Sequence, residues 1–181
     1  MRWARLFDDL GGQAEAAERA DRAAEAAELR RLELSRVAMT DRLAGAVGSR
    51  LTLAVEGVDP LDGVLLQVGG DWALVQGSGP ETLVVLSAVT AVTGLPVAAG
   101  SVGDALDRSL GLGFVLRRLA RDRAPVSVVV RTGQTFTGTI DRVGTDFLDV
   151  AEHAADLPRR ADAVRRVLTV PFGALAVVRP A

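Results

Sequence analysis

The sequence contains no cysteine, no lysine and only one histidine among its 181 residues. Without cysteine the chain cannot form a disulfide framework, a thiolate nucleophile or a Cys-based zinc site. Without lysine it has neither a Schiff base nor the phosphate-binding lysine of a P-loop. All 21 cationic side chains are therefore arginines, and 23 acidic residues bring the net charge to −2. This mildly acidic balance gives the chain as a whole no general attraction to phosphate or to anionic membranes.

Targeting and membrane segments are judged from the distribution of charge. The first thirty residues mix Arg, Asp and Glu and contain no apolar run like that of a signal peptide, so we expect a cytoplasmic protein. Residues 82–103 carry no charge over about the length that a bilayer requires. Gly94, Pro96 and Gly100 interrupt this stretch, and its β-branched residues are typical of strands. We therefore predict two buried strands there and no contact with a membrane.

Residues 1–38 are predicted to form an N-terminal, Ala-rich helical arm. Its apolar stripe consists largely of alanines, so the arm is interpreted as a partner-facing coiled coil or a solvated spacer, or as a helix packed on its own domain. Near the start, four apolar residues recur at i, i+3, i+4 and i+7 and form a candidate partner-binding face. These residues are Trp3, Leu6, Phe7 and Leu10.

Two similar series of a helix and five short strands follow the arm. In the first series a helix over residues 40–47 precedes strands at 51–55, 64–68, 72–76, 83–86 and 89–92, with Asp62-Gly63 read as a turn. In the second a helix over residues 112–120 precedes strands at 126–130, 136–143, 147–151, 167–170 and 175–178. Strands of this length and spacing are typical of small barrels.

The two series align residue by residue. Gly63 and Gly138, and Trp72 and Phe147, stand 75 positions apart, and beyond the third strand the offset becomes 86. The additional 11 residues enlarge the loop between the third and fourth strands of the second copy. We infer an internal duplication. The predicted fold is mainly β with helices (α+β), with a first five-stranded barrel over residues 39–99 and a linker helix and second barrel over residues 100–181.

This order of elements resembles the Sm-like (LSm) small β-barrel and, more broadly, SH3-like barrels, over about two thirds of the chain. In the first copy the residues that carry the resemblance are Leu53, Gly57, Gly63, Leu65, Val68, Gly70, Asp71, Trp72, Val84 and Val89. In the second copy they are Val128, Gly133, Gly138, Ile140, Val143, Gly144, Asp146, Phe147, Leu148 and the run 170–175. The whole chain is also similar to a group of high-GC actinobacterial proteins.

The resemblance implies a ring- or pair-forming barrel that binds single-stranded RNA. In RNA-binding Sm proteins an asparagine in the strand after the shared aspartate reads the base, and the matching positions here are Asp149 and Leu74. A carboxylate at that position repels the phosphates beside the base. Residues 172–174 and Ser87-Ala88 replace the second RNA-reading motif. We therefore expect the fold without the RNA-reading residues of the family.

Charge is distributed unevenly between the two predicted barrels. No cation lies between Leu51 and Asp107, whereas residues 100–181 contain 12 arginines and 9 acidic residues. A nucleic acid would therefore bind only the second barrel. The candidate nucleic-acid-binding residues are Arg117, Arg118, Arg121, Arg123, Arg159, Arg160, Arg165 and Arg166.

No pattern of residues indicates catalysis, so we predict no catalytic residue, no metal and no cofactor. His153, the only imidazole, is interpreted as a surface residue. Asp141, Asp146 and Asp149 lie near one another along the sequence, but alternation along strands separates their side chains. The leading hypothesis is a non-catalytic interaction or assembly protein that self-associates or docks a protein partner. The alternative is an RNA- or DNA-binding regulator that uses the Arg-rich second barrel, and a hydrolase is a distant third.

Overall fold

The structure is a computed structural model of the whole chain, which describes residues 18–19, 21–32, 34–96, 110–155 and 164–181. The chain divides into two compact units, residues 1–38 and residues 39–181. Within the first unit the described residues from 18 to 35 are helical and exposed. The predicted partner face of Trp3, Leu6, Phe7 and Leu10 lies outside the described residues.

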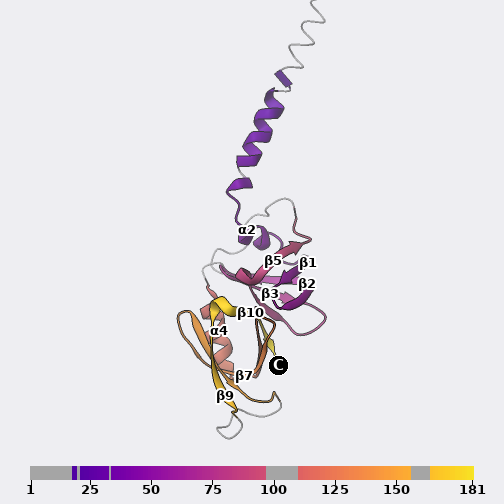
Figure 1. Cartoon of the computed structure of the whole chain (residues 1–181). Helices are drawn as coiled ribbons and strands as arrows, with labels where there is room; N and C mark the ends of the chain where they lie inside the picture. The colour runs from indigo at the N-terminus through magenta and orange to yellow at the C-terminus, as the bar shows by residue number, and fades with distance from the viewer. Residues whose placement is uncertain (1–17, 20, 33, 97–109, 156–163) are drawn as a thin grey trace, which may run out of the picture. The chain divides into compact units, whose positions relative to one another are not determined.

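The second unit is mainly β with few helices, as predicted, and its strands form one ten-stranded antiparallel sheet (Figure 1). The first half contains α2 (Met39–Ala44), β1 (Arg50–Val55), β2 (Val58–Val68), β3 (Trp72–Gln76), β4 (Thr82–Val85), the 3₁₀ turn η1 (Leu86–Ala88) and β5 (Val89–Thr93). The second half contains α4 (Leu112–Asp122), β6 (Val126–Val130), β7 (Thr135–Val143), β8 (Phe147–Glu152), β9 (Arg166–Pro171), the 3₁₀ turn η2 (Phe172–Ala174) and β10 (Leu175–Pro180).

The strand order along the sheet is β5-β1-β2-β3-β4-β10-β6-β7-β8-β9. Each half therefore has the same internal order, and the halves are joined by antiparallel pairing of β4 with β10. The sheet is continuous and is not closed into two separate barrels. The prediction of two separate five-stranded barrels, over residues 39–99 and 100–181, is therefore wrong in its closure. The open edge of β4 pairs with β10 of the other half and not with β5 of its own half, and backbone groups on a strand edge can be satisfied by either partner.

The two halves also agree in the register of their strand pairs. Leu53 pairs with Val92 in the first half, and Val128 pairs with Val178 in the second. Leu53 and Val128 stand 75 positions apart, and Val92 and Val178 stand 86 positions apart. These are the two offsets found in the sequence. The β2–β3 and β7–β8 pairs also carry a register irregularity at the same point. The similarity of the two sequence copies thus extends to individual backbone pairs.

The prediction of a turn at Asp62-Gly63 is wrong, because both residues lie inside β2. The chain reverses earlier, at Gly57, which has a positive φ of 71°. Gly63 is buried, and a Cβ atom added to it would collide with the carbonyl oxygen of Gln76 on the neighbouring strand. Glycine is therefore required here because two strands approach closely and not because the chain turns.

Two hydrophobic cores cross the boundary between the halves. The core of the first half includes Val129, Ala176 and Val177 from the second half. The core of the second half includes Trp72 and Leu83 from the first half, and it also contains two buried leucines of α4. Neither half therefore completes its core from its own residues, and the two halves form one unit.

Candidate interaction site

The contact between the halves is built on the pairing of β4 with β10. Val84 lies opposite Val177, and Leu83 lies opposite Val178. Because successive strand residues point to opposite faces, Val84 enters the core of the first half and Leu83 enters that of the second. Burial on both faces explains why all four residues of β4 are buried.

Two side chains at the start of β3, one from its first residue and one from the residue before it, hold the start of α4. The Asp71 carboxylate accepts a hydrogen bond of 2.7 Å from the backbone N–H of Leu112. The indole Nε1 of Trp72 donates a hydrogen bond of 2.8 Å to the carbonyl of Leu110. The N-cap residue of α4 is Gly111, which has no side chain to cap the helix, so Asp71 supplies the cap from the other half.

A third contact between the halves centres on Arg131, which directly follows β6. Its Nη2 donates a hydrogen bond of 2.6 Å to the hydroxyl of Ser87, and its Nη1 lies 3.7 Å from a carboxylate oxygen of Glu56. The Nε of Arg131 is buried and has no hydrogen-bond partner. The guanidinium thus retains an unused donor in a place that water does not reach.

The two ends of the sheet, β5 and β9, are each paired on one side only. On β9, Val167 is 57% exposed. On β5, Thr90, Ala91 and Thr93 are exposed. In the matching order of the two halves, β9 corresponds to β4 and β5 corresponds to β10. Inside the chain β4 pairs with β10. The two free edges, β9 and β5, are therefore the counterparts of the two strands that pair inside the chain.

An apolar cavity of about 460 Å³ lies beside β9. Its lining includes Val130, Arg131, Phe136, Leu168 and Val170. In the first half the corresponding place adjoins β4, where Val129, Ala176 and Val177 of the second half complete the core. Two apolar residues that line the cavity, Val130 and Val170, match Val55 and Val84, which pack in that shared core.

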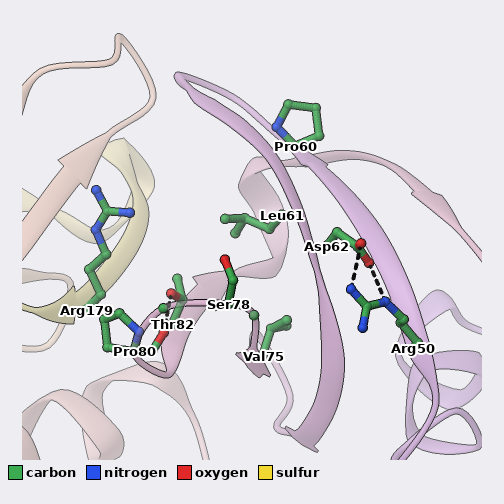
Figure 2. A pocket seen from close by; sticks show the side chains of 11 residues that line it. Arg50, Pro60, Leu61, Asp62, Val75, Ser78, Pro80, Thr82 and Arg179 are labelled. Carbon is green, nitrogen blue, oxygen red and sulfur yellow. Dashed lines mark hydrogen bonds and ion pairs between the residues drawn. The ribbon is translucent and has the colours of Figure 1, made fainter.

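A second pocket, of about 370 Å³, is lined by residues of the first half and by Arg179 of β10 (Figure 2). On one side Arg50 donates hydrogen bonds of 3.1 and 2.9 Å to the two carboxylate oxygens of Asp62, and on the other side stands Arg179. The hydrogen bond from Arg50 lowers the pKa of Asp62, and the same bond raises the pKa of Arg50. Because this pair neutralises itself, Arg179 is the one uncompensated charge among the side chains that line the pocket.

The predicted nucleic-acid-binding arginines have different surroundings. Arg117, Arg118 and Arg121 on α4, and Arg123 just after it, are all exposed. Arg166 forms an ion pair of 2.6 Å with Glu152 and is thereby neutralised.

The remaining predicted arginines lie in and after the enlarged loop. Arg165 is exposed, whereas Arg159 and Arg160 lie outside the described residues. Among the predicted arginines that the structure describes, those on and just after α4 form the one exposed group that shares a helix.

The interpretation of His153 as a surface residue is wrong, since its side chain is only 2% exposed. Its Nδ1 lies 2.8 Å from the carbonyl of Ala154, and its Nε2 lies 2.7 Å from the hydroxyl of Thr139. Both ring nitrogens therefore have partners within the protein. The buried imidazole connects the end of β8 to Thr139 of β7. No periodicity in the sequence marks this residue, because it follows the last residue of β8.

Among the described residues, no group of three or more His, Asp or Glu side chains is placed to hold a metal ion. No helix in the described part of the chain is long and apolar enough to cross a membrane. Asp149, at the position expected to read a base, accepts a hydrogen bond of 2.6 Å from the hydroxyl of Thr169 on β9. This carboxylate thus links two strands.

Sequence reasoning did not single out Glu56 and Arg131. Their signal was present, because they stand 75 residues apart, at matching positions of the two copies, and carry opposite charges. The sequence matches no known protein-family profile, and a comparison with curated proteins finds no significant relative.

Proposed function

We propose that the protein is a non-catalytic assembly protein, built from two Sm-like halves, that self-associates through its open sheet edges. The observation that supports this proposal is the β4–β10 pair, which joins the same two kinds of edge that β9 and β5 leave open. A second copy can repeat the contact with β5 beside β9. The two sequence offsets then place Ala91 of one copy opposite Val170 of the other, and Val92 opposite Thr169.

This contact is head-to-tail, since β9 of one copy pairs with β5 of the next. After one such contact the first copy still has a free β5 edge and the second still has a free β9 edge. Repetition of such a heterologous contact produces a closed ring when the rotation between copies closes, and an open filament when it does not. The face of Trp3, Leu6, Phe7 and Leu10 stays a separate prediction of a site for a protein partner.

Replacing Ala91 by arginine is expected to abolish self-association, because a long charged side chain at an exposed position of β5 blocks the approach of β9. Light scattering over a range of concentrations measures the effect, and the wild-type chain should have a molar mass above that of one copy. The matched control is Ser78→Arg, which places the same side chain in the exposed loop between β3 and β4.

The proposal fails if the wild-type chain remains a monomer at every concentration, or if Ala91→Arg assembles like the wild type. A shortened chain that begins at Val37 separates the arm from the edges. It should still assemble if the contact is made by β5 and β9.

The alternative function is RNA or DNA binding, and one observation favours it. Four exposed arginines stand on and just after α4, and no ion pair neutralises them within the described part of the chain. Clustered exposed arginines on one helix form an electrostatic footprint for phosphates. The four residues are Arg117, Arg118, Arg121 and Arg123.

If these arginines contact phosphates, the affinity for single-stranded RNA falls as salt rises. The triple variant Arg117→Gln, Arg118→Gln, Arg121→Gln should reduce the slope of log affinity against log salt by about 2, since each single-strand phosphate contact contributes about 0.7. Fluorescence anisotropy between low and physiological salt measures it. The control removes three arginines from the arm, at Arg22, Arg30 and Arg31. Flat binding curves at low salt would exclude this function.

A further inference from the structure

Glu56 and Arg131 occupy the same position in the two halves. Glu56 directly follows β1, which ends at Val55, and Arg131 directly follows β6, which ends at Val130. Within one chain these two side chains meet across the β4–β10 contact at 3.7 Å. The half that contributes β4 thus provides a carboxylate, and the half that contributes β10 provides a guanidinium.

The roles are exchanged in the contact between copies. There the second half contributes β9 in place of β4, so Arg131 takes the position that Glu56 has inside the chain. The first half of the second copy contributes β5 in place of β10, so its Glu56 takes the position of Arg131. The pair that results again combines one guanidinium and one carboxylate, although neither residue has changed.

The surroundings of Arg131 fit a second carboxylate. Arg131 lines the apolar cavity beside β9, and its side chain is 27% exposed, so part of it is accessible to a second copy. Its 3.7 Å contact with Glu56 is an ion pair without a hydrogen bond, so neither side chain is saturated by the other. The Glu56 side chain is 42% exposed and therefore accessible to another copy.

We propose that Glu56 of a second copy pairs with Arg131 when β5 docks beside β9, so that glutamate and arginine alternate from copy to copy along the assembly. This inference rests on the proposed self-association and names the residues that make it selective. Complementary charges favour contact with another copy of this chain and disfavour an edge that carries a positive charge at the corresponding place.

The test mixes two charge-reversed variants. Alone, Glu56→Arg sets two guanidinium groups against each other in the contact between copies, and Arg131→Glu sets two carboxylates against each other. Each variant should therefore self-associate at least about tenfold more weakly than the wild type. In an equimolar mixture every contact between unlike variants again joins opposite charges. The mixture should therefore recover assembly, measured by light scattering or analytical ultracentrifugation.

Mixing changes only the contact between copies. Within each variant chain, residues 56 and 131 still carry like charges. Recovery in the mixture thus supports the pair between copies. Undiminished assembly of the single variants overturns the inference, and so does weakened assembly without recovery. In both cases the proposed function stands if the wild type assembles, whereas a monomeric wild type refutes the proposed function itself.

A second measurement tests the inference if Glu56→Arg or Arg131→Glu fails to fold. Association of the wild type should weaken with added salt, and Glu56→Gln, which keeps the size of the side chain, should remove most of that dependence. An unchanged salt dependence in Glu56→Gln overturns the inference. The matched control is Glu81→Gln, at an exposed acidic residue that lies on neither β5 nor β9, which removes the same charge and should keep the salt dependence of the wild type.

Discussion

Replacement of Trp72 by alanine is expected to lower the free energy of unfolding by about 3–5 kcal/mol. The Trp72 side chain is only 3% exposed, and it belongs to the first half while packing in the core of the second. The substitution removes the ring from that core and also removes the hydrogen bond to the carbonyl of Leu110. Denaturant unfolding followed by circular dichroism measures the loss.

The control for this substitution is Trp72→Phe, because phenylalanine is the residue that the second half has at the matching position, Phe147. A phenyl ring retains most of the packing but cannot donate to Leu110, so about 1 kcal/mol should be lost. Amide exchange at Leu112 should accelerate in Trp72→Ala, since the start of α4 loses one of its two anchors. A loss below about 1 kcal/mol in Trp72→Ala would contradict the shared core.

Gly138→Ala is expected to destabilise the protein by about 3 kcal/mol, at the upper end of the usual effect of overpacking. Gly138 is buried in β7, and a Cβ atom added there would collide with the carbonyl oxygen of Ala151 on β8. The backbone of the neighbouring strand has to move, since no flexible side chain can yield. Thermal and denaturant unfolding measure the effect.

Two further variants bracket the Gly138 result. Gly63→Ala should cost a similar amount, because Gly63 meets Gln76 of β3 in the same way and in the same register. Gly79→Ala should be nearly neutral, since no atom lies within 4 Å of an added Cβ there. Equal stabilities of Gly138→Ala and Gly79→Ala would refute the close approach of β7 and β8.

Most secondary structure could be predicted from the sequence because its signals are local. The predicted strands at 72–76 and 126–130 agree with β3 and β6, and the predicted helix at 112–120 agrees with α4 except at its end. The turn at Asp62-Gly63 failed for a tertiary reason. An Asp-Gly pair is typical of turns, and the collision that requires glycine at position 63 exists only once β3 lies beside β2.

The candidate site was less predictable, because it consists of contacts between distant residues. The sequence showed Arg131 as one arginine among 21, and only the pairing of β4 with β10 brings it to Glu56 and Ser87. It likewise predicted an exposed His153, which is buried against Thr139 of β7. Four predicted arginines do gather on and after α4, because helical spacing is a local property.

The sequence by itself determined the kind of elements, their repetition at offsets of 75 and 86, and the separation of acidic from Arg-rich halves. Each of these follows from residues that are neighbours along the chain. Only the tertiary structure decided that the ten strands form one sheet with β5 and β9 at its open ends. The reason is that a strand edge carries the same backbone donors and acceptors whatever its sequence, so its partner is chosen by packing of the surrounding cores.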